Sequence, residues 1–193
     1  MSDLNAIDVN LKSGDEPFSF YEKELGFNLL NFWSWSQSDL LSNSLRGVIA
    51  EYIVKQDLDI DNGARIEWDA YDLITKSGVK VEVKSSAYLQ SWKQKEFSKI
   101  SFDISPSRGW DSQTNEYSKE SKRQSDFYIF CLLKHQDKET VNPLKLEQWT
   151  FYVLPTETLD EKKPNQKRIT LNSLLQFNPK ECIFGEIKEI IKF

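Results

Sequence analysis

The sequence has very few of the residues that build zinc sites and disulfide frameworks. It contains two cysteines, Cys131 and Cys182, which do not form a CxxC motif, and a single histidine, His135. Cys131 lies in the apolar run FYIFCLL, where a thiol normally packs as a small hydrophobic group. We therefore expect neither a structural zinc site nor a disulfide framework. The single histidine also argues against histidine-based catalysis.

Long hydrophobic runs and targeting signals are also missing. No apolar stretch approaches the roughly 20 residues needed to span a bilayer, and no basic region followed by an apolar one opens the N-terminal segment MSDLNAIDVNLKSGDEPFSF. We therefore expect a cytoplasmic protein without membrane contact. The net charge of −5 argues against a generally basic nucleic-acid-binding surface, although a local basic cluster can still bind phosphates.

Length and composition favour one globular unit. A chain of 193 residues is long enough to bury a sizeable core, and a hydrophobic content of 39% with 13% aromatics is too high for intrinsic disorder. The six prolines and seven glycines are scattered instead of gathered in a linker. We expect a single domain over residues 1–193, with a core at about 40–155 and a C-terminal strand and helix extension at about 156–193.

Hydrophobic periodicity predicts a helix followed by several strands. In residues 40–57, LLSNSLRGVIAEYIVKQD, apolar side chains recur at the spacing of one helix face, and Ser42 to Ser44 are candidate N-caps. We expect a long polar loop at 105–125, a short strand running into a helix at ITLNSLLQF, and a terminal helix at 184–193. Strands are predicted at 66–75, 79–85, 100–104, 127–133 and 149–154. This order indicates an α/β or α+β sheet protein.

Charged and apolar residues alternate along the predicted strand 79–85. Its three valines point to one face, which should be the core, and Lys80, Glu82 and Lys84 point to the other. Taken alone, this pattern is also that of an ordinary amphipathic hairpin whose charged face is solvated. The preceding turn therefore decides what these charges meet.

The turn sequence TKSG predicts a hairpin with a three-residue loop at 76–78, in which Gly78 supplies the positive φ that such loops need. In that register Asp72 lies opposite Glu82. A two-residue loop would instead pair Asp72 with Val83 on the buried face and would remove the site.

A cation would offset the repulsion between two opposed carboxylates. Directly opposed Cβ atoms lie about 4.5–5.5 Å apart, where like charges destabilise a sheet. Mg²⁺ is usually held by one or two carboxylates with waters and substrate phosphates, and Asp72 and Glu82 offer such a pair. Lys84 lies two residues further on the same face. A metal that activates water and polarises a phosphate, next to a lysine that orients the nucleophile, suits phosphodiester hydrolysis.

The combined pattern resembles the PD-(D/E)XK nuclease superfamily. Asp72, a short hairpin and the triplet EVK at 82–84 carry this resemblance, which extends over about residues 40–135. The segment LRGVIAEYIV resembles the RGxxxE-type helix of Holliday-junction-resolvase-like members and offers Glu51. Tyr71 stands where the superfamily usually has a proline. Gln90 resembles a glutamine that some members carry just after the motif strand.

The resemblance implies a restriction-endonuclease-like fold, a mixed central sheet flanked by helices. It implies that Asp72, Glu82 and the Val83 backbone carbonyl bind Mg²⁺, for which Mn²⁺ could substitute. Glu51 would complete the metal shell directly or through water, and Lys84 would assist the attacking water.

Two of these residues have a plainer alternative. Glu51 could be a solvated helix residue that pairs with Lys55 at i+4. Gln90, a candidate catalytic residue through the resemblance, could be a surface residue on the turn that follows the strand.

The expected function is that of a metal-dependent DNA endonuclease, similar to restriction enzymes or junction resolvases. DNA is the expected partner, and double-strand cleavage by a single-site enzyme would favour a homodimer. The alternative is a catalytically inactive module that binds nucleic acid or protein on the same fold. A glycoside hydrolase is disfavoured, because its paired carboxylates need no neighbouring lysine.

Nucleic-acid contacts are expected near the hairpin and in the polar loop. Residues 76–99 are locally basic, and residues 105–125 mix basic and aromatic side chains that could follow a backbone or stack on a base. A solvated loop and, for Trp92, packing in the core are the alternatives. The candidate contacts are Lys80, Trp92, Lys93, Lys95, Arg108, Lys122 and Arg123.

Overall fold

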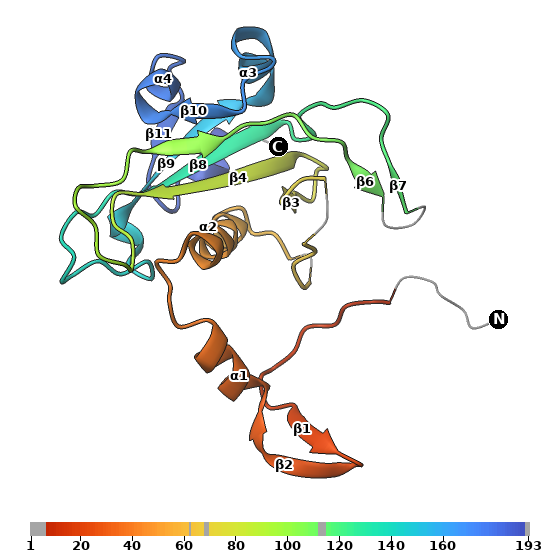
Figure 1. The fold of residues 1–193 in the computed structure, drawn as a ribbon. Coiled ribbons are helices and arrows are strands. Elements are labelled where there is room, and N and C mark those ends of the chain that lie inside the picture. Colours follow the sequence, from red (N-terminus) through yellow and green to blue (C-terminus); the bar gives the residue numbers. More distant parts are fainter. Residues whose placement is uncertain (1–6, 62, 68–69, 112–114, 192–193) are drawn as a thin grey trace.

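The computed structural model describes residues 7–61, 63–67, 70–111 and 115–191. Its centre is a five-stranded sheet with the order β11-β9-β8-β4-β3 (Figure 1). Strands β4 and β8 are parallel, and the other neighbours are antiparallel. The predicted α+β fold with a mixed central sheet is therefore confirmed. The strands are β3 Leu73–Ile74, β4 Lys80–Ala87, β8 Phe127–Leu133, β9 Trp149–Pro155 and β11 Lys180–Cys182.

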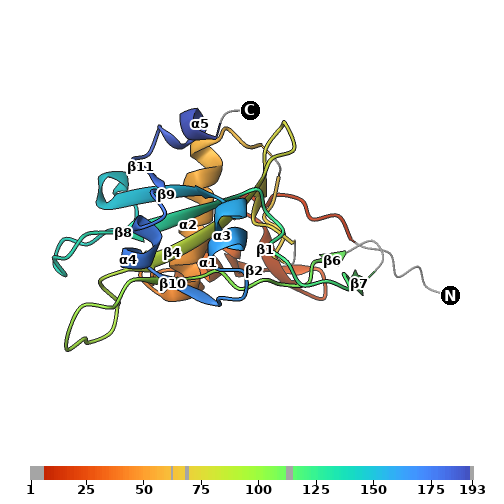
Figure 2. The same cartoon turned by 90° about the horizontal axis from the view of Figure 1, so that it is seen from above.

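Both faces of the central sheet are covered (Figures 1 and 2). Helices α2 (Asn43–Asp57) and α5 (Ile187–Ile190) pack on one face. The other face carries α3, α4 and a two-stranded sheet of β5 and β10. In the part of the chain that the structure describes, no helix is long and apolar enough to cross a membrane. The bounds on this second face are β5 Ser101–Asp103, α3 Thr156–Lys162, β10 Arg168–Thr170 and α4 Leu171–Leu175.

Strand β8 shows why its sequence is a continuous apolar run. Ile129, Cys131 and Leu133 pack towards α2, whereas Tyr128 and Phe130 pack towards β5 and β10. A strand buried on both faces needs no polar residues. The neighbouring β4 is apolar only towards α2, so its other face is available for charged side chains.

The hairpin of β3 and β4 has the predicted register. Leu73 pairs with Val81, and the Thr75 N–H donates to the Val79 carbonyl at 2.9 Å. The Gly78 N–H donates to the Thr75 carbonyl at 3.0 Å, and Gly78 has a φ of 88°. The three-residue loop is therefore confirmed. The paired residues end at Leu73, and the Asp72 N–H donates to the Val81 carbonyl at 3.2 Å, so the predicted opposition of Asp72 and Glu82 falls just beyond the regular ladder.

Most predicted elements exist, with different bounds. The predicted helix at 40–57 begins three residues later, at Asn43, because Ser42 is its N-cap and accepts from the Leu45 N–H. The strand predicted at 66–75 was wrong in length: only β3 forms, and residues 68–69 lie outside the described residues. The predicted terminal helix at 184–193 shortens to α5, with its last two residues also outside.

Five elements were not predicted outside the N-terminal region. The polar segment at 105–125 contains the small hairpin of β6 (Trp110–Asp111) and β7 (Glu116–Tyr117). Strand β11 and helix α3 were also missed as elements. The short 3-10 helix Leu146–Gln148 precedes β9.

The N-terminal region forms a small unit of its own that the sequence did not predict. We call residues 14–36 the N-terminal arm. It comprises the hairpin of β1 (Pro17–Phe20) and β2 (Lys23–Asn28), followed by α1 (Leu29–Ser36). Figure 1 shows the arm projecting away from the central sheet on the α2 side.

Arg123 has a structural role, which corrects its prediction as a nucleic-acid contact. Its side chain is fully buried and forms an ion pair with Asp160 at 2.6 Å. The guanidinium also donates to the carbonyls of Ile104 at 2.9 Å, Lys163 at 2.8 Å and Gln166 at 3.4 Å. Arginine suits this position because its planar fork of donors can satisfy several acceptors at once. Arg123 thus ties the chain after β5 to α3 and the segment that follows it.

We predict that Arg123→Ala lowers the free energy of unfolding by about 3–5 kcal/mol, because it removes a buried guanidinium and leaves several backbone carbonyls without their donor. The matched control is Lys122→Ala, since Lys122 is the exposed neighbour. Exposed substitutions of this kind change stability by about 0.5 kcal/mol or less. Urea unfolding measures both values, and equal destabilisation by the two variants would contradict the assignment.

Candidate active site

Glu82 and Lys84 lie side by side on the charged face of β4. The Lys84 Nζ and a Glu82 carboxylate oxygen are 2.5 Å apart, and both side chains are largely shielded from solvent. Burial disfavours the charge on Lys84, but Glu82 and Asp72 outweigh this effect and raise the pKa of Lys84 above its ordinary value. Lys84 is therefore a cation at neutral pH.

Asp72 lies just before β3 and is fixed to β4. Its Oδ2 accepts a hydrogen bond of 2.7 Å from the backbone N–H of Val83. Burial, followed by the neighbouring charge of Glu82, raises the pKa of Asp72 to about 7, although Lys84 acts in the opposite direction. The site thus holds a carboxylate whose charged form is costly without a further cation.

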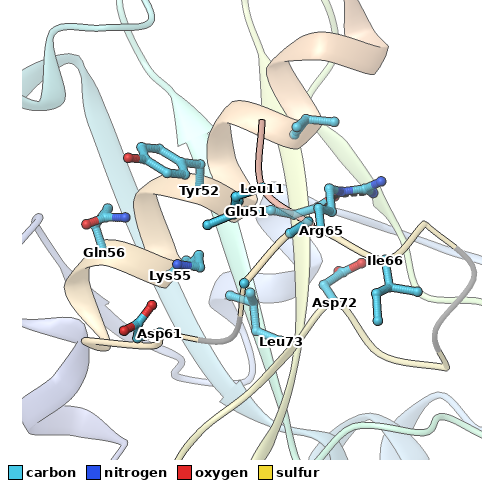
Figure 3. Close-up of a pocket in the computed structure, with 13 residues that line it drawn as sticks. Leu11, Glu51, Tyr52, Lys55, Gln56, Asp61, Arg65, Ile66, Asp72 and Leu73 are labelled. Carbon is cyan, nitrogen blue, oxygen red and sulfur yellow. Dashed lines mark hydrogen bonds and ion pairs between the residues drawn. The ribbon is translucent and has the colours of Figure 1, made fainter. Parts of the chain in front are cut away.

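Glu51 on α2 lines the same pocket as Asp72. Its carboxylate is held by both arms of the Arg65 guanidinium, with distances of 2.5 and 3.1 Å. The expected alternative, a pair with Lys55, is not among the ion pairs of the described residues. Figure 3 shows Glu51, Arg65 and Asp72 around one pocket of about 400 Å³.

Arg65 is a site residue that the sequence analysis missed. Its hydrogen bond to Glu51 raises the pKa of Arg65, and Asp72 adds to this effect. Arg65 precedes the hairpin in an irregular segment, 14 residues after its partner in the chain. Neither helical nor strand periodicity relates two residues at that separation, so no signal in the sequence indicated the pair.

The donor set suits a small, hard cation with few protein ligands. Among the described residues, no three histidine, cysteine, aspartate or glutamate side chains lie close enough together to hold a metal. Glu51 is therefore not brought into one cluster with Asp72 and Glu82. Two carboxylates and a backbone carbonyl at Val83 are still a fitting set for Mg²⁺, which commonly keeps several waters and takes one or two carboxylates.

Gln90 is buried, which corrects the alternative that it is a surface residue, whereas its catalytic role stays a prediction. Its side chain is buried, accepts from Arg46 at 3.3 Å, and donates to Ser98 at 3.2 Å. Arg46 in turn donates to Ser85, at the end of the motif strand, at 3.3 Å. Gln90 is therefore connected to β4 through Arg46.

Arg46 is the second functional candidate that the sequence analysis did not single out. It is buried, and its guanidinium also donates to the Leu41 carbonyl at 3.0 Å and to Asn43 at 2.8 Å. Desolvation lowers the pKa of Arg46 to about 10. In the described part of the chain its partners are all neutral oxygens, so it joins the start of α2 to β4 without an ion pair.

The predicted nucleic-acid contacts fall into two groups at opposite ends of β4 (Figure 1). Trp92, Lys93 and Lys95 are exposed in the loop after β4. Arg108 and Lys122 are exposed near the β6–β7 hairpin, and Arg108 lies 5.8 Å from the centre of the Tyr117 ring.

The surroundings of Trp92 and Lys80 bear on their prediction as nucleic-acid contacts. Trp92 is 54% exposed, so the alternative that it packs in the core was wrong. Lys80 is partly buried, lies over the Tyr71 ring at 5.1 Å, and occupies β4 itself. Lys80 is thus the predicted contact that shares a strand with Glu82 and Lys84.

We predict that Asp72→Asn stabilises the metal-free protein at pH 8 by about 5 °C in melting temperature. A folded-state pKa raised from 3.8 to about 7 means that the native state loses stability as the pH rises through this range. Asparagine imitates the protonated side chain and keeps an acceptor for the Val83 N–H. Thermal melts in the presence of a chelator should show the gain at pH 8 and its disappearance towards pH 4.

Asp137→Asn is the matched control for this measurement. A hydrogen bond from Thr140 lowers the pKa of the Asp137 carboxyl, so removing its charge should not stabilise the protein at pH 8. A melting temperature of Asp72→Asn that does not exceed that of the wild type at pH 8 would contradict the proposed cost of the Asp72 charge.

Comparison with known proteins gives a family for this chain. The family model described as bacteriophage T4 endonuclease IV matches residues 28–178. The matched range runs from the end of β2 to the segment before β11 and includes Glu51, Asp72, Glu82 and Lys84. No curated protein matches the sequence. Because the match covers most of the chain, the protein belongs to the bacteriophage T4 endonuclease IV family, which is a family of nucleases.

Proposed function

We propose that this nuclease is a Mg²⁺-dependent DNA endonuclease that uses PD-(D/E)XK chemistry. The observation that carries the proposal is the position of Asp72 on the Val83 N–H, beside the ion pair of Glu82 and Lys84. The raised pKa of Asp72 supports it, because burial and the charge of Glu82 create a demand for positive charge there. Membership of an endonuclease family supports a nucleic-acid substrate.

Asp72, Glu82 and the Val83 carbonyl would hold the metal. A bound Mg²⁺ supplies charge to polarise the scissile phosphate and lowers the pKa of a coordinated water. The N–H of Val83 fixes the orientation of the Asp72 carboxylate, because it occupies Oδ2 and leaves Oδ1 directed away from that bond. The backbone thereby preorganises one ligand before substrate arrives.

Lys84 would act as a cation and hydrogen-bond donor. Its pKa is raised above the ordinary value, because Glu82 and Asp72 outweigh the effect of burial, so it does not serve as a general base at neutral pH. If Glu82 bound a metal, the Lys84 ammonium would be freed from part of its ion pair. It could then donate to the attacking water or to a phosphate oxygen, where negative charge develops in the reaction.

Glu51 would take part in this site only after a rearrangement. Its two carboxylate oxygens are both bound by Arg65, which neutralises the charge that a metal would use. Arg65 is partly exposed and comes from an irregular segment, so the pair can open at modest cost. Glu51 would then contribute through a water, and Arg65 would be free to contact a phosphate of the substrate.

The basic residues on β4 and at its two ends would bind the DNA. Lys80 lies on the motif strand, Arg108 and Lys122 lie at one end of it, and Lys93 and Lys95 lie at the other with Trp92. Such side chains bind phosphates, and an exposed tryptophan can stack on an unpaired base.

We predict that the wild-type protein cleaves DNA only with Mg²⁺ or Mn²⁺, and that Lys84→Ala lowers the cleavage rate at least about 100-fold, as expected for removal of a group that stabilises transition-state charge. Plasmid, branched and single-stranded DNA are the substrates to compare, with a chelator as the blank. Lys80→Ala is the matched control, since it removes a lysine from the same face of β4 and should mainly weaken binding. Cleavage that survives the chelator or the Lys84 substitution would contradict the proposal.

We predict that Mg²⁺ raises the melting temperature of the wild type at pH 8 and leaves Glu82→Gln unchanged. Binding to the native state alone stabilises it by mass action, by about 2.7 kcal/mol when the metal is present at 100 times its dissociation constant. Titration calorimetry should give the same difference between the two proteins. Equal metal binding by both would remove Glu82 from the ligand set, and no binding by either would favour an inactive module that uses the same fold to bind nucleic acid.

A further inference from the structure

The N-terminal arm exposes many apolar side chains. None of the side chains of α1, all of which the structure describes, is buried. Trp35 on α1 is 82% exposed, and Tyr21 at the tip of the hairpin is 89% exposed. Figure 1 shows the hairpin and α1 apart from the central sheet. The exposed apolar residues of the arm are Phe18, Phe20, Tyr21, Leu25, Phe27, Leu30, Phe32 and Trp35.

The arm has regular structure but little internal support. Phe18 and Phe27 are in contact, with ring centres 4.9 Å apart, and Gly14 fits closely against Trp33. A two-stranded hairpin and an eight-residue helix are each marginal in water without further packing. A surface that covers the arm would supply the missing packing.

The turn between β1 and β2 also favours packing of the arm against another surface. Tyr21 and Glu22, which connect β1 to β2, have φ values of 47° and 64°. This left-handed conformation is favoured by glycine and asparagine and is strained for bulky side chains. The hairpin thus carries a backbone cost that contacts made by the exposed aromatic rings would offset.

Charge argues against nucleic acid as the occupant. Residues 14–36 contain four acidic residues and one lysine, Lys23, so the arm would repel phosphates. The same charge disfavours an anionic membrane surface. A protein surface with apolar groups remains the fitting partner.

The area of the arm matches a protein interface. At about 200 Å² for each fully exposed aromatic side chain, the eight exposed residues present on the order of 800 Å² of apolar surface. Stable interfaces bury about 800 Å² on each partner. A second copy of the chain brings an identical surface, and a two-fold axis would bury both arms at once.

We propose that the N-terminal arms of two copies of this chain pack against each other and form a homodimer. The aromatic side chains of β1, β2 and α1 form the interface, and the acidic residues of the arm lie at its rim. The interface is separate from Asp72 and Glu82, and the inference does not depend on the proposed nuclease activity.

Sedimentation velocity of the full chain tests this proposal. We expect a dimer at micromolar concentrations, and Phe20→Glu and Trp35→Glu should each raise the dissociation constant at least tenfold. Ile183→Glu is the matched control, because Ile183 is 55% exposed but lies outside the arm. Circular dichroism and thermal melts show whether each variant is folded, and double substitution at both arm positions should give a folded monomer.

Cysteine cross-linking provides a second measurement that does not rely on destabilising the interface. Both native cysteines are buried, so a Ser34→Cys substitution on exposed α1 adds one reactive thiol to each arm. Mild oxidation should produce a covalent dimer of twice 22.6 kDa on a non-reducing gel. The control Glu139→Cys places the thiol on an exposed loop away from the arm and should give no such product.

Three outcomes would overturn the proposal. The first is a wild-type chain that stays monomeric at high micromolar concentration. The second is a dimer that tolerates both arm substitutions, which would place the interface elsewhere. The third is a monomer whose arm variants lose binding to lipid vesicles or to single-stranded DNA, which would assign the arm to one of those occupants instead.

Discussion

Asp72 is held against β4, near Glu82, because β3 pairs with β4 in the register that the Gly78 turn sets. Side chains alternate faces along a strand, so a shift of this register by one residue would turn Asp72 towards the core. The Val83 N–H then holds the Asp72 carboxylate in place. The charges of the candidate active site are therefore brought together by backbone geometry, against their mutual repulsion.

Burial of the sheet on both faces determines the electrostatics of Asp72 and Glu82. Helix α2 closes one face, and β5 with β10 closes the other over β8, so β4 runs beside the buried core. Burial raises the pKa of Asp72, and two cations, Lys84 and Arg65, lie among the three carboxylates of the region. The protein thus accepts a locally unfavourable charge at the place where a metal and a phosphate would compensate it. Such a loss of stability is common at sites organised for chemistry.

Arginine and lysine have different roles in this protein. Arg46 and Arg123 are buried and satisfy arrays of backbone and side-chain oxygens, and Arg65 binds Glu51 with two hydrogen bonds. The planar guanidinium makes several directed bonds at once, which suits joining distant segments. The lysines at 93, 95 and 122 remain exposed. Their mobile ammonium groups suit contacts with a phosphate backbone and cost little when unpaired in water.

Local physical rules in the sequence determined the central part of the fold. Alternation in β4, the apolar run of β8 and the turn at Gly78 each depend on neighbouring residues, so the strands and the hairpin register were predictable. Only the tertiary structure decided the partners of Glu51, Gln90 and Arg123. Their partners include residues 14, 44 and 37 positions away, respectively. The tertiary structure also decided the exposure of the N-terminal arm. Aromatic residues are typical of a core, but nothing within the described residues buries those of the arm. Periodicity reports which face of an element is apolar, and only packing reveals what covers that face.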